Sequence, residues 1–166
     1  MKDKGIYELI NAFDKLNKKY EKIRLIMVGG AETIDINELQ LSNNIEMVGE
    51  VNNPRYYYKI SDCLIHPSYH EGMSNVMLEA AATGRPLLAS NIPGCKEIID
   101  DGVNGFLFEP RSSDAIVEAV EKFMALSFEE RQEMGRKSRE KVEREFDRQI
   151  VVDAYMKEIE RILEEN

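Results

Sequence analysis

The segment that decides the fold is residues 63–75, which read CLIHPSYHEGMSN. Its first part, Cys63–His66, is an apolar run typical of a short buried strand. Ser74 is a preferred N-cap residue, so a helix is expected from Ser74 to Thr83. The segment therefore predicts a strand joined to a helix by a loop that contains a glycine, Gly72.

The same alternation of short apolar runs and amphipathic stretches continues on both sides. Further strands are expected at 23–28, 45–48, 86–89 and 105–108, and further helices at 5–20, 36–42, 54–60, 96–100, 113–126, 128–145 and 148–164. This order predicts parallel βαβ units. The expected fold class is α/β: a Rossmann-like doubly wound parallel sheet with helices on both faces and a helical C-terminal tail. Such sheets bind ligands beyond the carboxyl ends of their strands.

Composition narrows the possible functions. The 166 residues suffice for one domain with a substantial core. Their 22 basic and 31 acidic residues give a net charge of −9, which disfavours non-specific binding to nucleic acid or anionic lipid. The first ten residues lack the layout of a signal peptide, no apolar run is long enough to span a membrane, and Cys63 and Cys95 lack metal-site spacing. A reducing cytoplasm is the expected compartment.

The loop after the strand at 63–66 has the features of an anion site. Gly72 lets a ligand approach the backbone closely. Free N–H groups near Ser74, Asn75 and Val76, together with the helix dipole, favour a phosphate or diphosphate there. Three glutamate pairs in the chain are eight residues apart, so that spacing alone decides nothing. Only one of these pairs, Glu71 and Glu79, brackets a glycine-containing loop at a strand-to-helix junction.

The run from Pro67 to Pro86 resembles the signature of retaining glycosyltransferase family 4, whose members have the two-domain GT-B architecture and carry Glu-x7-Glu at this junction. Other segments resemble the family in the same order along the chain: Lys4-Gly5, Leu25–Gly29, Val48–Val51, Tyr58 with Asp62, Pro93–Glu97, Asp101–Gly105 and Asp147–Tyr155. Two segments, 69–75 and 93–95, are most similar to the branch that extends polyprenyl-diphosphate-linked sugars.

The resemblance implies a role for each matching residue. Glu71 would contact the donor sugar and is the candidate catalytic residue. Glu79 would accept hydrogen bonds from both ribose hydroxyls, and Lys4 would neutralise a phosphate. Backbone groups would hold the rest of the donor: Val51 the base edge, and Gly72, Met73, Ser74, Asn75 and Val76 the diphosphate.

The resemblance also implies the reaction. A hexosyl or N-acetylhexosaminyl unit would pass, with retention, from a nucleotide sugar, most often a UDP-sugar, to a glycan or polyprenyl-diphosphate-linked acceptor in surface polysaccharide or glycoconjugate synthesis. No metal or other cofactor is expected, since the chain lacks Asp-x-Asp. The whole enzyme would be cytoplasmic, at the inner face of the plasma membrane.

The chain departs from the family in length. Members are about twice as long, so residues 1–147 would be the donor-binding domain without its first strand and without the arginine that precedes Lys4-Gly5. Residues 148–166 would be a helix that crosses to an absent N-terminal acceptor-binding domain. Its apolar residues would then be exposed or self-associating. On this interpretation the chain alone binds the donor but does not transfer sugar.

Other interpretations remain open at this point. The chain could be a non-catalytic module that binds a nucleotide or docks a partner, or a UDP-sugar epimerase of GT-B architecture. A dinucleotide-dependent oxidoreductase is disfavoured, because residues 28–32 do not form Gly-x-Gly-x-x-Gly. Some residues also have plain structural interpretations. His66 is interpreted as a core residue, His70 as a loop residue, and the tyrosines at 56–58 mainly as helix packing.

Overall fold

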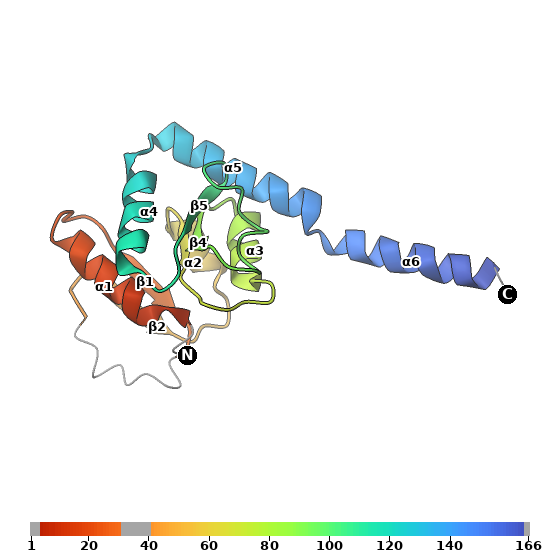
Figure 1. The fold of residues 1–166 in the computed structure, drawn as a ribbon, viewed down its shortest axis with the longest axis horizontal. Coiled ribbons are helices and arrows are strands. Elements are labelled where there is room, and N and C mark those ends of the chain that lie inside the picture. Colours follow the sequence, from red (N-terminus) through yellow and green to blue (C-terminus); the bar gives the residue numbers. More distant parts are fainter. Residues whose placement is uncertain (1–3, 31–40, 165–166) are drawn as a thin grey trace.

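The computed structural model describes residues 4–30 and 41–164. They form an α/β body from which one long helix projects (Figure 1). The elements in chain order are α1 (Ile6–Asn17), β1 (Leu25–Val28), β2 (Ile45–Gly49), α2 (Arg55–Ile60), β3 (Leu64–His66), α3 (Asn75–Ala82), β4 (Leu87–Ser90), β5 (Gly105–Phe108), α4 (Ser113–Ala125), α5 (Phe128–Glu145) and α6 (Arg148–Glu164). The expected α/β class and helical tail are confirmed.

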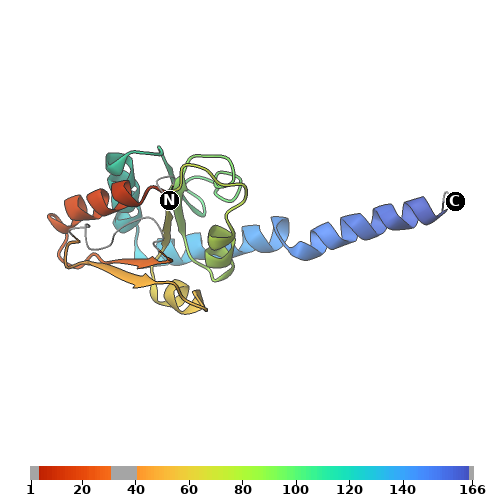
Figure 2. The ribbon, with the colours of Figure 1, turned by 90° about the horizontal axis from the view of Figure 1, so that it is seen from below.

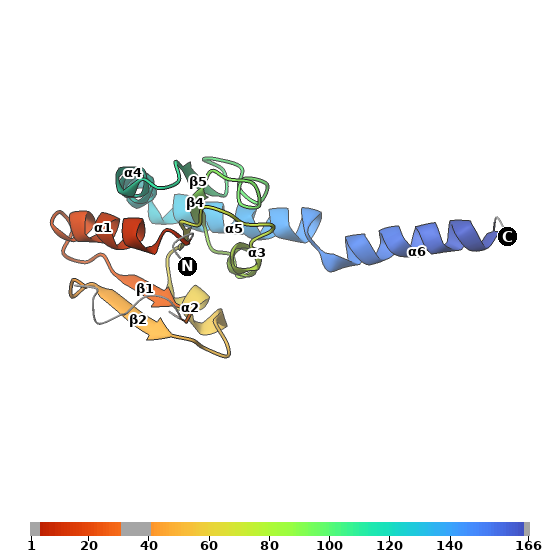
Figure 3. The same ribbon diagram turned by 60° about the horizontal axis from the view of Figure 1, so that its bottom comes forward.

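All strand pairs are parallel, and the strands are divided into two sheets. One sheet has the order β1-β2 and the other β3-β4-β5. Among the described residues, β1 and β3 each pair with one strand only, so the two sheets are not joined through them. The two sheets lie apart in Figure 3. They still share a core, because Leu25 and Ile45 of the first sheet belong to the same buried cluster as Leu88 and Phe108 of the second.

Helices cover these strands in two groups. In the first, α1 packs against α4, and Leu9, Phe13 and Leu16 of α1 recur at helical spacing and are buried. In the second, α3 packs against α5, with Met77 of α3 fully buried. Figure 1 shows α1 and α4 at one side of the body and α3 at the other, with α5 running across the top from α4 toward α3.

One expected helix is absent, and another falls mainly outside the described residues. Residues 96–98 form turns and residues 99 and 100 have no regular structure, because the amide N–H of Asp100 donates to Asn104 Oδ1 and the Ile98 carbonyl accepts from Asn104 Nδ2. These backbone groups are thereby satisfied by a side chain instead of by a helix. Of the helix expected at 36–42, only residues 41 and 42 are described, and they are not helical.

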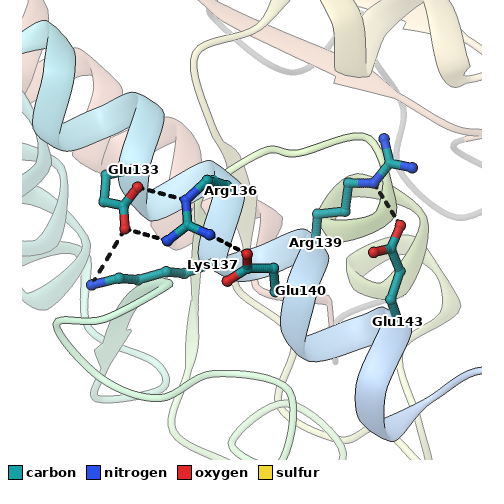
Figure 4. Close-up of polar contacts among 6 residues, drawn as sticks. All are labelled: Glu133, Arg136, Lys137, Arg139, Glu140 and Glu143. Atoms are coloured by element: carbon teal, nitrogen blue, oxygen red, sulfur yellow. Dashed lines mark hydrogen bonds and ion pairs between the residues drawn. The ribbon is translucent and has the colours of Figure 1, made fainter.

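The outer face of α5 is a ladder of ion pairs (Figure 4). Arg136 pairs with Glu133 and Glu140, and Arg139 Nε lies 2.7 Å from Glu143 Oε1. Pairs three or four residues apart support a helix by about 0.2–0.5 kcal/mol each. This face is therefore a solvated helix surface.

The last helix, α6, leads away from the body in both Figure 1 and Figure 2, and each of its described residues is exposed. Its apolar side chains include Ile150, Val151, Ile159 and Ile162, all close to half exposed. The expectation that these positions are exposed in this chain is confirmed. Among the described residues, no helix combines the length and apolar character that crossing a membrane requires.

Candidate functional site

Lys4 and Glu71 are 67 residues apart in sequence but form an ion pair. Lys4 Nζ lies 2.6 Å from Glu71 Oε1. Gly5 makes this approach possible, because it has φ of 65° and a Cβ there would come within 2.1 Å of the Pro67 carbonyl oxygen. The segment before α1 is thus pressed against the loop that follows β3, which carries Glu71.

His66, the last residue of β3, also contacts the Glu71 carboxylate. Its Nε2 atom lies 2.9 Å from Glu71 Oε1 and 3.3 Å from Ser74 Oγ. Burial lowers the pKa of His66, although Glu71 opposes this shift, so the ring is neutral at pH 7. Glu71 is an acceptor, which assigns the ring proton to Nε2.

Glu71 is held as a carboxylate. Burial acts to raise the pKa of Glu71, but hydrogen bonds from Lys4, His66 and Ser68 outweigh burial and leave the pKa below its usual value. Its side chain is 15% exposed, compared with 48% for Lys4. The negative charge is therefore oriented within the site, while the lysine remains open to solvent.

The N-terminus of α3 faces the same loop. Ser74 is the N-cap, as expected, and its Oγ accepts from the Met77 N–H. The Ser74 N–H donates to the Gly94 carbonyl across 3.3 Å, so it is already engaged. Within the described part of the chain, four expected backbone donors have no hydrogen-bond partner: Gly72, Met73, Asn75 and Val76.

The loop after β4 packs closely against the backbone of the loop that carries Glu71. Gly94 has φ of 86°, and a Cβ there would lie 2.6 Å from the Glu71 carbonyl oxygen. Between the two loops is an open cavity of about 280 Å³. It is lined by Tyr69, His70, Glu71, Gly72, Ile92 and Pro93.

Glu79 lies at a second cavity, of about 410 Å³, between α3 and the connection from β2 to α2. The lining residues are Asn53, Pro54, Arg55, Glu79, Ala82 and Thr83. Glu79 is five residues beyond the N-cap of α3, about 7.5 Å along the helix axis. Val51 lies two residues before the cavity wall at Asn53. The structure thus brings Lys4 and Glu71 together at the first cavity and places Glu79 at the second, whereas Val51 lines neither cavity.

His66 belongs to the site, although its sequence context suggested a core residue. A histidine in a short strand does not differ from a core histidine in pattern. The one available signal was its position as the last residue of a parallel strand, at the edge where such sheets bind ligands. Among residues 4–30 and 41–164, no three His, Cys, Asp or Glu side chains come together in a way that could hold a metal ion.

Parallel strands, a glycine-containing loop and a helix N-terminus at the strand ends are the features by which open α/β sheets commonly bind ligands. Residues 1–141 match the family described as Glycosyl transferases group 1. The chain belongs to this family, and its architecture is that of the C-terminal domain of GT-B glycosyltransferases.

Three proteins illustrate the similarity. The capsular polysaccharide biosynthesis glycosyltransferase CapM of Staphylococcus aureus is 31% identical over 157 residues, which cover 91% of this chain and 41% of that protein. A glycosyltransferase structure from Rickettsia africae has a TM-score of 0.87 at 24% identity, covering 99% of this chain and 46% of that one. HepE of Anabaena, in complex with UDP-glucose, has a TM-score of 0.79 at 22% identity, covering 100% of this chain and 46% of that one. The chain spans less than half the length of each.

Proposed function

We propose that this chain is the donor-binding half of a retaining family 4 glycosyltransferase that takes a hexosyl or N-acetylhexosaminyl unit from a UDP-sugar. The observation that carries the proposal is the Lys4–Glu71–His66 cluster beside the N-terminus of α3. The membership of the chain in its family and the UDP-glucose bound to HepE support a nucleotide-sugar donor.

In the proposed complex the diphosphate lies at the N-terminus of α3. The unpartnered N–H groups of Asn75 and Val76, and those of Gly72 and Met73, donate to its oxygens, and the helix dipole favours its charge. Lys4 turns from Glu71 toward the diphosphate, a small movement for a flexible and half-exposed side chain. The sugar then occupies the cavity beside Glu71.

This arrangement favours departure of the nucleoside diphosphate. Negative charge grows on the diphosphate as the bond to the sugar breaks, so fixed dipoles and Lys4 stabilise the transition state more than the ground state. Glu71 faces the reacting sugar and Glu79 binds the ribose. Protein groups perform these tasks, and no metal or other cofactor takes part in them.

The acceptor side of the proposal rests on the relatives. CapM is named for capsular polysaccharide biosynthesis, which favours a glycan or polyprenyl-diphosphate-linked acceptor at the inner face of the plasma membrane. Residues 1–147 would bind the donor, and α6 would cross to an acceptor-binding domain. The exposed apolar residues of α6 suit such a docking role.

Calorimetric titration of the chain tests the donor site. We expect UDP to bind much more tightly than uridine, and added salt to reduce this preference only in part because the site is partly buried. NAD should not compete, and binding should not require Mg²⁺. Equal affinity for UDP and uridine would contradict the diphosphate site.

A further inference from the structure

Glu79, which lies at the second cavity, accepts a hydrogen bond from a tyrosine of a neighbouring helix. Tyr58 lies on α2, and its hydroxyl donates to Glu79 Oε2 across 3.0 Å. Glu79 is exposed on α3, where a glutamate otherwise samples several rotamers. The hydrogen bond selects one of them before any ligand arrives.

Tyr58 is itself firmly placed. The residue is 8% exposed and belongs to the buried cluster that contains Met77 and Ala80 of α3. Its backbone N–H donates to the carbonyl of Pro54, which lines the cavity. Tyr58 therefore connects the two walls of the cavity, one from the start of α2 and one from α3.

The direction of this hydrogen bond is fixed. Burial raises the pKa of Tyr58, and the Glu79 carboxylate raises it further, so the hydroxyl keeps its proton and donates. Within the described residues, Glu79 Oε1 has no hydrogen-bond partner. The carboxylate thus has one oxygen secured by the protein and one available to a ligand at the cavity wall.

We propose that Tyr58 is a positioning residue that fixes the Glu79 carboxylate for the paired hydroxyls of a ribose. The inference rests on the proposed function, from which the ribose at Glu79 is taken. It assigns to Tyr58 a selectivity for ribonucleotides over nucleotides that lack these hydroxyls. Preorganisation of this kind increases affinity because less rotamer freedom is lost on binding.

The test compares four forms of the chain: the wild type, Tyr58→Phe, Glu79→Ala and the double variant. Each is titrated with UDP and with 2′,3′-dideoxyuridine diphosphate. Tyr57→Phe is the matched control, since the Tyr57 hydroxyl is on the same helix and has no partner in the described part of the chain. Unfolding in urea verifies that every variant is folded.

We expect Tyr58→Phe to raise the Kd for UDP about 3- to 10-fold, the usual effect of losing one hydrogen bond. The Kd for the dideoxy nucleotide should change less than about twofold, because that ligand has no hydroxyls for Glu79 to accept. Tyr58→Phe should have no further effect in the Glu79→Ala background. Tyr57→Phe should leave both affinities unchanged.

The outcomes separate the two proposals. If the wild type does not bind UDP, or Glu79→Ala leaves UDP binding unchanged, the proposed function or its ribose assignment is wrong. If Glu79→Ala weakens binding but Tyr58→Phe does not, the positioning role is overturned while the donor site stands. If Tyr58→Phe weakens the binding of both nucleotides equally, the positioning role is also overturned, since this result would indicate a general structural effect.

Discussion

At the scale of single residues, His66 and Glu71 are coupled at the centre of the candidate site. The Nε2 atom of His66 contacts Glu71 and Ser74, and Glu71 also accepts from Lys4. The neutral ring donates a hydrogen bond to Glu71. The His66 side chain is mostly buried, so water would solvate its cationic form poorly. Its protonation would therefore disturb both Glu71 and the Ser74 N-cap of α3.

This coupling predicts a pH dependence of stability. Burial holds the pKa of His66 below 6.5, so between that pH and the lower folded pKa the unfolded chain binds a proton that the folded chain does not. The free energy of unfolding should fall as the pH drops through 6.5. It should fall again below about 4.5, because the pKa of Glu71 is also depressed in the folded state.

Urea unfolding between pH 7.5 and 5 measures the first decrease. His66→Gln retains a hydrogen-bond donor but does not titrate, so we expect a flatter profile in this variant. His70→Gln is the control, because His70 is the other histidine of the chain and is exposed. A slope that persists in His66→Gln and disappears in His70→Gln would contradict the assignment.

At the scale of elements, the loop before β5 is organised by one buried side chain. Asn104 is 1% exposed, and its amide group bonds to the Asp100 N–H and the Ile98 carbonyl. Its own carbonyl accepts from Ser138 Oγ of α5 across 2.7 Å. The Asp101–Gly105 segment, which resembles a family motif, therefore has a structural role in this chain.

Asn104→Ala should lower the free energy of unfolding by about 2–4 kcal/mol, because the buried Ile98 carbonyl and the part-buried Asp100 N–H lose their partners. Denaturation in urea measures this change. Asn91→Ala, at an exposed position of the same connection between β4 and β5, should cost less than about 0.5 kcal/mol. Equal stabilities of the two variants would show that the turn does not depend on the Asn104 amide.

Much of the element pattern follows from local sequence. Apolar periodicity predicts the helices and parallel strands, and Ser74 predicts the start of α3, because these signals lie within a few residues. The absence of a helix at 96–100 could not be predicted, because it depends on the Asn104 side chain, four or more residues away from the groups it bonds. The division into two sheets and the contacts of Glu71 with Lys4 and of Glu79 with Tyr58 depend on pairing between distant segments, which periodicity does not encode.

At the scale of the whole molecule, the candidate site and the exposed apolar helix are at different places. The two cavities lie on the α/β body, whereas α6 leaves it with apolar residues exposed along its length. The relatives reported above are more than twice as long as the chain. Retaining transfer requires the donor and acceptor to meet in a closed site from which water is excluded.

We therefore expect residues 1–166 to bind a uridine nucleotide weakly and to transfer no sugar. Joining the chain to the N-terminal half of a family member should restore transfer of radiolabelled sugar from UDP-sugars to a polyprenyl-diphosphate-linked acceptor. UDP binding by the joined protein verifies that the donor site is intact. In this protein Glu71→Gln should lower kcat far more than it raises KM, because contacts with the reacting sugar count mainly in the transition state. Clear sugar transfer by residues 1–166 alone would contradict the assignment of donor and acceptor binding to two different domains. The acceptor would then have to bind on the α/β body itself.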